Sequence, residues 1–350
     1  MARILYGVQC TGHGHAVRGL TIARHFREHE FLFVSSWMGA DVLRDEFRVL
    51  DLPQPASPVH NHRLSLTGTL LSALKMRVRS KQIMGRLLEA VDRFQPDVTV
   101  SDYENFVARL SRQLGIPCLS LDHQHIITAC RHQVPWRQML GYLGAYYAIR
   151  THFDLAQDYL VISFFRPPMR PQVRAKILPP LLRETVLTRQ PRNGDHVVAY
   201  QGYTTFENFF TFLKHIPSPV KVYGFNEDRV EGNLFFKKKS EAGFLEDLSA
   251  CRYVVCGGSH TLISEALYYG KPVISFPIKN QIEQFLNAHY VEKLGYGRCF
   301  TGFSPRAEII PAFEDRLDHY RANIRAGDFC GNQEIFRLVD QFIREKKLDY

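Results

Sequence analysis

The most distinctive chemistry in this sequence is a glycine-rich turn between an apolar run and a helical pattern, in the stretch CGGSHTLISEALYYGKPVISFP. Gly257 and Gly258 permit a tight turn and close approach of another group to the backbone. Ser259 or Thr261 can cap the following helix, whose free N–H groups and dipole suit an anion. Thr261 and Glu265 share one helix face, so a phosphate and a ribose diol could bind side by side. The competing interpretation is purely structural: a capped helix with a surface glutamate.

Histidines and carboxylates form a second set of reactive side chains. Gly12, His13, Gly14 and His15 follow the first predicted strand, Asp102 and Glu104 follow VTVS, and Asp122, His123 and His125 follow CLSL. In the second half, Gly202, Thr204 and Thr205 follow a strand in the same way. Ligands of open parallel sheets bind beyond the carboxyl ends of the strands. The inferred site is therefore a cleft with acid–base groups on one side and an anion-binding turn on the other.

Alternating strands and helices must position these groups. The predicted strands of the first half are 4–8, 31–35, 98–101 and 118–121, with helices at 16–29 and around 81–94. The alternation restarts with strands at 197–201, 221–223, 234–237, 253–256 and 273–276. Such alternation predicts an α/β protein whose parallel sheets are covered by helices on both faces.

The length of 350 residues predicts about two domains. The two series of strands are separated by a segment rich in proline and arginine, interpreted as a linker at 166–194. The predicted domains are 1–165 and 195–330, each Rossmann-like. A last helical pattern near 333–346, within residues 331–350, can cross back to the first domain.

The composition is that of a folded protein, with 45% hydrophobic and 23% charged residues. No stretch reaches the roughly 18–20 apolar residues that span a bilayer, and MARILYGVQC is interpreted as a first strand rather than a secretory signal. Seven cysteines without a Cys-x-x-Cys pair predict buried reduced thiols and a cytoplasmic protein.

The net charge of +9 is unevenly distributed. Residues 1–180 hold 22 lysines and arginines against 14 acidic residues, whereas residues 181–350 hold 22 against 21. This excess predicts an anionic partner for the first half: a membrane surface, an acidic substrate or nucleic acid. The alternative is a charge that serves solubility alone.

Together the motifs resemble a known family. Residues 256–297 combine Gly-Gly-Ser, Ser-Glu-Ala, Gly-Lys-Pro and Glu-Gln-x-x-Asn-Ala. They resemble the donor-binding domain of inverting GT-B glycosyltransferases, above all the MurG-like group and the UDP-glycosyltransferases. A weaker likeness, GVQCTGHGHAVRGLTIA at 7–23, is to the acceptor-side loop of the same families. Over about the whole chain, the resemblance implies two Rossmann-like domains facing across a cleft. The C-terminal domain would bind a sugar-nucleotide donor, and the N-terminal domain would bind the acceptor.

The resemblance also implies roles for single residues. His15 matches the position of the catalytic base and Asp102 that of the carboxylate that orients it, while Glu104 is the fallback base. Gly12, His13, Gly14 and His123 are assigned to the acceptor side. The donor-binding set is Gly202, Phe244, Gly257, Gly258, Ser259, His260, Thr261, Glu265, Glu283, Gln284 and Asn287. Within it, the turn would hold the diphosphate, Glu265 the ribose, the segment ending at Phe244 the base, and residues 283–287 the transferred sugar.

Two departures leave the donor's base and sugar open. The UDP-glycosyltransferases carry a tryptophan-containing signature before the glycine turn, and this chain has none. His260 also stands where MurG has a small residue.

Inverting transfer requires a base that takes the acceptor's hydroxyl proton, and a positioned histidine typically contributes about 10²–10⁴-fold. Helix N–H groups and Thr261 would stabilise the departing diphosphate. The chain has no Asp-x-Asp and no zinc-type spacing, so no metal is expected. The structural alternatives are a His15 that packs or caps its helix and an Asp102 that only ends a strand.

The acceptor side is rich in apolar and cationic residues. RLSLTGTLLSALKMRVRSKQIMGRLL at 63–88 and VPWRQMLGYLGAYYAIR at 134–150 both combine them. Such segments suit peripheral contact with anionic lipid, which predicts a lipid-linked or cell-envelope acceptor at the inner face of the plasma membrane. The alternative is ordinary packing with a solvated basic face.

Rival functions stay open. A sugar-nucleotide 2-epimerase shares the GT-B architecture and needs no acceptor, and a non-catalytic sugar-nucleotide-binding protein needs no base. An NAD-dependent oxidoreductase is less well supported, because CTGHGH lacks Gly-x-Gly-x-x-Gly. Nucleic-acid binding has no recognised motif here.

Overall fold

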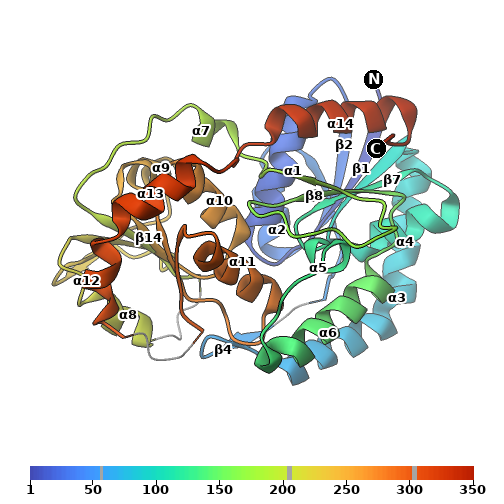
Figure 1. Ribbon diagram of the computed structural model, residues 1–350. Coiled ribbons are helices and arrows are strands. Elements are labelled where there is room, and N and C mark those ends of the chain that lie inside the picture. Colours follow the sequence, from blue (N-terminus) through green and yellow to red (C-terminus); the bar gives the residue numbers. More distant parts are fainter. Residues whose placement is uncertain (56–57, 203–206, 302–305) are drawn as a thin grey trace. The chain divides into compact units, whose positions relative to one another are not determined.

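The computed structural model describes residues 1–55, 58–202, 207–301 and 306–350. The chain folds into two compact units (Figure 1). Unit 1 comprises Met1–Pro58, Ser65–Arg183 and Cys330–Tyr350, and unit 2 comprises Val59–Leu64 and Glu184–Phe329.

Unit 1 is built on a seven-stranded parallel sheet with the order β3-β2-β1-β6-β7-β8-β9. Its strands are β1 (Arg3–Val8), β2 (Glu30–Ser35), β3 (Arg48–Asp51), β6 (Val98–Asp102), β7 (Cys118–Asp122), β8 (Asp158–Ile162) and β9 (Lys176–Leu178). The chain order reverses between β1 and β6. A reversal of this kind leaves a crevice at the carboxyl ends of the two strands, where ligands bind.

Helices cover both faces of this sheet. They are α1 (His13–His25), α2 (Trp37–Arg44), α3 (Leu66–Phe94), α4 (Asn105–Leu114), α5 (Ile126–Ala129), α6 (Trp136–His152) and α14 (Asn332–Glu345). Successive residues of a strand point to opposite faces. Ile4, Tyr6 and Val8 accordingly join one core with α1 and α14, while Leu5 joins another with α3 and α4.

Unit 2 repeats this plan with a sheet of the order β12-β13-β11-β10-β14-β15-β16. Among the described strands of this sheet, only the β12–β13 pair is antiparallel. The strands are β10 (Val197–Tyr200), β11 (Val220–Tyr223), β12 (Arg229–Glu231), β13 (Leu234–Phe236), β14 (Val254–Cys256), β15 (Val273–Ser275) and β16 (Gly297–Cys299). The helices are α7 (Glu184–Leu187), α8 (Glu207–Leu213), α9 (Glu241–Ala250), α10 (His260–Tyr268), α11 (Ile282–Lys293), α12 (Ile309–Glu314) and α13 (Leu317–Arg325). Here the order reverses between β10 and β14.

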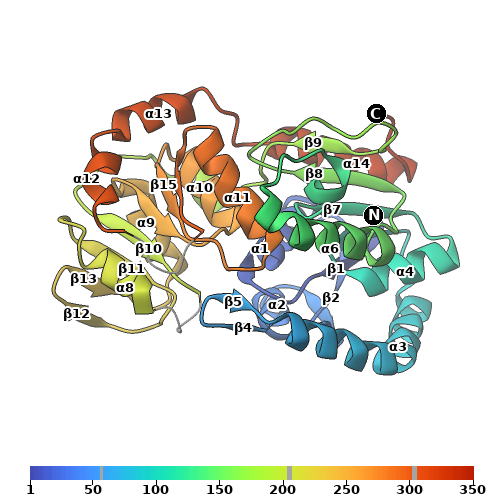
Figure 2. The ribbon, with the colours of Figure 1, turned by 60° about the horizontal axis from the view of Figure 1, so that its bottom comes forward.

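A two-stranded hairpin, β4 (Val59–His60) and β5 (Arg63–Leu64), also belongs to unit 2 (Figure 2). The chain therefore passes between the units at four places. The sequence predicted the linker and the return of the last helix, but not the two crossings beside the hairpin.

The linker expected at 166–194 differs from the structure. Lys176–Leu178 forms β9, the edge strand of the first sheet, and the change of unit falls between Arg183 and Glu184. The short strand was hidden by the prolines around it. The last helix, α14, packs in the core of unit 1.

The alternating parallel α/β architecture is confirmed, and the predicted strands all form within one or two residues of their expected ends. None of the described helices is both long and apolar enough to cross a bilayer.

Candidate active site

His15 and Asp102 meet at the switch point of unit 1. His15 lies in the first turn of α1, directly after β1, and Asp102 ends the neighbouring strand β6. His15 Nδ1 lies 2.7 Å from Asp102 Oδ1. Asp102 is fully buried and His15 is 9% exposed, so the pair sits at the edge of the protein interior. This is the arrangement in which a carboxylate orients an imidazole.

Arg18 is a third member of this cluster that sequence reasoning missed. One turn after His15, its Nε and Nη2 donate to the two oxygens of Asp102 at 2.9 and 2.6 Å. This is the bidentate geometry that arginine forms with carboxylates. Burial opposes the charge of Arg18, but the Asp102 carboxylate outweighs it and raises the arginine pKa. The buried carboxylate is thus neutralised within the cluster.

The neighbours of the ring restrict its tautomer. Arg18 Nη2 lies 2.8 Å from His15 Nδ1, the same nitrogen that faces Asp102. When Nδ1 carries the proton it donates to Asp102, and it cannot then accept from Arg18. Nε2 then carries the lone pair and accepts from the Gln124 amide nitrogen at 3.3 Å. A base role therefore requires the tautomer that Asp102 selects.

Glu104 is used as a helix cap. Its Oε1 accepts from Phe106 N at 3.0 Å and its Oε2 from Val107 N at 2.7 Å, at the start of α4. Burial raises the pKa of Glu104 to about 7, against the opposing effect of these two bonds. Both oxygens are occupied by the backbone, which corrects the fallback role as a base.

The assignment of His123 to the acceptor side is also corrected. The ring has no exposed surface, and its Nδ1 lies 2.8 Å from Ile162 O. His125 is equally internal and forms a 2.6 Å pair with Asp122. Burial opposes charge on Asp122, but His125 holds its pKa down at about 2. These histidines support the β7 connection rather than contact a ligand.

The other predicted acceptor-side residues lie at the surface. Gly12 caps α1 with φ 84°, a conformation that favours glycine. It is exposed, and His13 and Gly14 beside it are half-buried. This segment is therefore accessible next to His15.

In unit 2 the glycine turn follows β14 at the second switch point and leads directly into α10. Ser259 occupies the N-cap position, but its side chain makes no capping hydrogen bond, so the predicted side-chain cap is absent. The first backbone bond of the helix runs from Ile263 N to Ser259 O at 3.0 Å. The N–H groups before it are those that bind anions at helix starts.

Gln284 and Asn287, both on α11, hold this turn by hydrogen bonds to its backbone. Gln284 Oε1 accepts from Gly258 N at 3.2 Å, and Asn287 Nδ2 donates to Gly258 O at 2.9 Å. Asn287 is fully buried and also bonds Glu283 at 3.1 Å. The structure therefore gives Asn287 a support role instead of the predicted contact with the sugar, whereas Glu283 and Gln284 keep partly exposed surface.

The remaining donor-side predictions spread along α10. Thr261 is half-buried in its first turn, while His260 and Glu265 are 5% and 2% exposed. Glu265 lies one turn after Thr261, on the face that the spacing predicts. A ribose could thus reach only a small part of the Glu265 side chain.

An aromatic cluster lies at the carboxyl ends of β10 and β11. The Phe244 ring on α9 meets the Tyr200 and Tyr223 rings edge-on, with centroids 5.9 and 5.0 Å away. Phe244 is partly exposed, which leaves surface for a planar base. Gly202 is exposed just beyond β10, and Thr204 and Thr205 lie outside the described residues.

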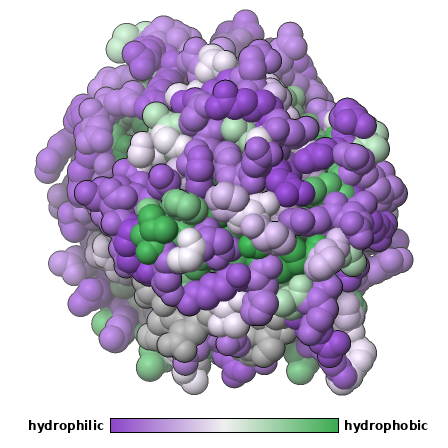
Figure 3. Space-filling model, turned by 90° about the vertical axis from the view of Figure 1, so that its left-hand side faces the viewer, coloured by the Kyte–Doolittle hydropathy of each residue, from purple (hydrophilic) through white to green (hydrophobic). Residues whose placement is uncertain are grey.

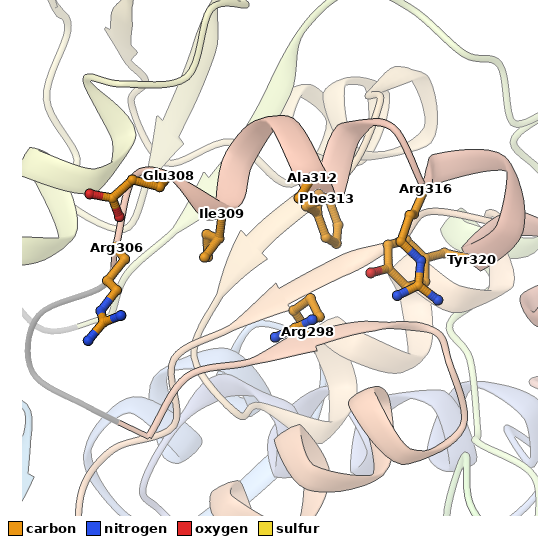
Figure 4. Close-up of a pocket in the computed structure, with 8 residues that line it drawn as sticks. All are labelled: Arg298, Arg306, Glu308, Ile309, Ala312, Phe313, Arg316 and Tyr320. Atoms are coloured by element: carbon orange, nitrogen blue, oxygen red, sulfur yellow. The ribbon is translucent and has the colours of Figure 1, made fainter.

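A cavity of about 550 Å³ lies elsewhere in unit 2, between β16 and helices α12 and α13 (Figure 4). It is lined by Arg298, Arg306 and Arg316, together with Tyr320, and by none of the predicted donor residues. Arg306 and Arg316 lie at opposite ends, and Arg316 stands over the Tyr320 ring at 5.4 Å. The arginines do not converge on one point, and none of the residues lining the cavity belongs to the glycine turn.

The described part of the chain contains no group of three or more histidine, cysteine or carboxylate side chains able to hold a metal ion. The family comparison agrees with the motifs. The model of glycosyl transferase family 1 matches residues 2–317. The chain belongs to glycosyl transferase family 1.

Two archaeal relatives align with this chain over almost its whole length. An uncharacterized glycosyltransferase of Methanosarcina acetivorans is 25% identical over 372 residues, which cover 96% of this chain and 97% of that protein. An uncharacterized glycosyltransferase of Methanosarcina mazei is 22% identical over 94% of this chain and 96% of its own length.

Solved structures share the fold. MurG of Acinetobacter baumannii, 13% identical, matches with a TM-score of 0.60 over 97% of this chain and 100% of its own. CalG4, the calicheamicin glycosyltransferase, is 17% identical with a TM-score of 0.63 over 98% of both chains. UGT2 of Phytolacca americana, complexed with UDP-2fluoro-glucose and pterostilbene, is 13% identical with a TM-score of 0.66 over 98% and 100%. The fold of this glycosyltransferase is therefore GT-B.

Proposed function

We propose that this glycosyltransferase moves a sugar from a nucleoside-diphosphate donor, UDP-linked, to a hydroxyl acceptor with inversion at the anomeric carbon. The observation that carries the proposal is the Gly257–Ser259 turn at the start of α10, whose backbone is hydrogen-bonded by Gln284 and Asn287. Solved relatives in complex with thymidine diphosphate and with UDP-2fluoro-glucose support a nucleotide donor.

The proposed chemistry follows from the side chains of each unit. The N–H groups at the start of α10 would bind the diphosphate and stabilise its charge as the glycosidic bond breaks. His15 Nε2 would take the hydroxyl proton, and the imidazolium would keep its Nδ1–H on Asp102. In this proposal no metal is needed, because the N–H groups of α10 stabilise the negative charge of the diphosphate and His15 holds the proton of the hydroxyl group.

Nucleotide binding is the direct test of the donor site. Melting curves are recorded with UDP, GDP, dTDP, CMP and NAD in EDTA. At 100 times Kd a bound nucleotide adds about 2.7 kcal/mol to the unfolding free energy, which raises the melting temperature visibly. We expect a shift with one nucleoside diphosphate, UDP first. A shift with NAD alone would contradict the proposal, and so would the absence of a shift with every nucleoside diphosphate.

Metal independence is checked by turnover in the same buffer. Loss of activity in EDTA and its return with Mn²⁺ would show that a cation, not the helix alone, neutralises the diphosphate.

The acceptor is proposed to be lipid-linked, because unit 1 exposes two apolar stripes. On α3, Leu70, Leu74 and Val78 are 63%, 50% and 84% exposed, and on α6, Trp136 and Leu140 are 80% and 85% exposed. Each set recurs at helical spacing on one face. Among the large exposed hydrophobic residues of the described chain, only Val230 and Leu294 belong to unit 2. The face drawn in Figure 3 is mainly hydrophilic, with small hydrophobic areas only.

Basic residues flank the α3 stripe, which supports an anionic lipid surface as the partner. Lys75, Arg77 and Arg79 are exposed. Each such charge contributes about 1 kcal/mol near an anionic membrane. Their replacement by glutamine should weaken sedimentation with phosphatidylglycerol vesicles roughly tenfold or more. The matched control replaces Lys237, Lys238 and Lys239 of unit 2. Equal binding by both triple variants would rule out this surface.

A further inference from the structure

We infer that the β4–β5 hairpin is part of the donor-binding machinery and that His62 is a positioning residue for the Gly257–Ser259 turn. The inference rests on the proposed function for its consequence, but the structural link it states can be measured without a substrate. It concerns only residues of unit 2.

The hairpin pairs through backbone hydrogen bonds with the segment that follows β15. Leu64 N donates to Lys279 O at 2.9 Å, and Lys279 N donates to His62 O at 3.0 Å. These two backbone bonds form a parallel bridge between Arg63 and Lys279. A strand added in this way gains affinity from main-chain hydrogen bonds. Six residues from the first half of the sequence thereby fix a loop of the second half.

His62 secures this attachment with its side chain. The ring is buried, and its Nε2 lies 2.9 Å from Phe276 O, an acceptor to which the nitrogen donates. Burial lowers the pKa of His62, against the opposing effect of hydrogen bonds to the backbone carbonyls of Phe276 and Pro277, so the neutral ring is favoured. Asn61 and His62 form the hairpin turn with φ 46° and 55°. Two-residue turns of this hand favour glycine at the second position, so histidine is accepted there at a conformational cost.

The loop held by His62 is directly bonded to the glycine turn. Phe276 N donates to Cys256 O at 2.8 Å, and Ser275 Oγ donates to Gly257 O at 3.0 Å. Gln284 Oε1 accepts from both Ile278 N and Gly258 N, at 3.1 and 3.2 Å. One side-chain oxygen therefore ties the His62-held loop to the turn. Displacement of the loop would be passed on to the N–H groups that face the diphosphate.

Hydrogen exchange of the ligand-free protein is the first test. In His62→Ala the amides of Ile278 and Gly258 should exchange about tenfold faster, the equivalent of one lost hydrogen bond. His62→Gln, which keeps a donor, should recover most of the protection. The control is His215→Ala, which removes an exposed histidine of unit 2 whose Nδ1 lies 2.7 Å from Thr211 O, and it should match wild type at both amides. Unchanged exchange at Gly258 in a folded His62→Ala protein would overturn the inference, whatever the protein's activity.

Donor kinetics supply the second test. His62→Ala should raise Kd for UDP and KM for the donor about tenfold, with kcat at saturating donor within about threefold. A purely structural role would lower the melting temperature and leave KM of the folded fraction unchanged. If His62→Ala does not fold, wild type still decides the matter: UDP should slow exchange at Leu64 and Lys279 together with Gly258. Protection of Gly258 without the hairpin amides would overturn the inference. Wild type that binds no nucleotide would instead count against the proposed function.

Discussion

Replacement of His15 by alanine should lower kcat by about 10²–10⁴-fold and leave nucleotide affinity within about twofold of wild type. The size of the loss is that of one positioned base. The nucleotide is bound in unit 2 under the proposal, whereas His15 lies in unit 1, so binding and turnover should separate cleanly. The measurement is kcat with saturating donor, beside the melting-temperature shift with UDP.

Asp102→Asn should lower kcat in the same way and also cost stability. The amide keeps the shape of the carboxylate but no longer selects the Nδ1–H tautomer of His15, and it leaves the Arg18 cation buried without its counter-charge. Breaking a buried pair from one side costs about 3–5 kcal/mol. His15→Ala leaves the Arg18–Asp102 pair intact and should unfold near the wild-type temperature.

Glu104→Gln is the matched control for this site. It lies two residues from Asp102, and it should cost about 1 kcal/mol of stability as a weakened helix cap while turnover stays near wild type. Full activity in His15→Ala would refute the assignment of His15 as the base. Loss of activity in a folded Glu104→Gln protein would favour Glu104 instead.

Gly258→Ala should abolish donor binding. A Cβ at this position would lie 2.4 Å from Gln284 O and 2.7 Å from Gln284 C, contacts with backbone that cannot swing away. The turn must move off α11, and with it the N–H groups at the start of α10. We expect UDP affinity to fall at least about 100-fold, because an anion site of this kind depends on the aim of several donors at once.

Gly257→Ala is the comparison one residue away. Its nearest neighbour would be Gln284 Oε1 at 3.6 Å, an ordinary van der Waals distance. UDP affinity should stay within a few-fold of wild type. Titration of both variants with UDP decides the point, and similar losses in both would mean that the tight packing of Gly258 is not what the donor site requires.

Strand ends could be predicted from the sequence because strongly apolar runs stop at polar residues. That logic placed His15, Asp102 and the glycine turn after the carboxyl ends of strands, and the strand order of the structure puts each of these places at a switch point. It could not say which way side chains point. His123 and Asn287 stand in the same sequence motifs as the residues expected to bind ligands. In the structure, however, the His123 ring contacts Ile162 O and the Asn287 amide donates to Gly258 O inside the fold.

Long-range pairing accounts for the residues that were missed. Arg18 reads as a surface residue of an amphipathic helix, and only a partner 84 positions away makes it a buried cation. The hairpin around His62 is too short to show alternation, and its acceptor is 214 positions away. Neither relation leaves a local signal in residue order.

The hairpin makes unit 2, the half proposed to bind the donor, a discontinuous module. A fragment that begins at Glu184 would lack Val59–Leu64, and with them the bonds on Lys279 and Phe276. Exchange of C-terminal halves between relatives would likewise join a hairpin from one protein to a loop from another. A working chimera would therefore have to carry both pieces across together.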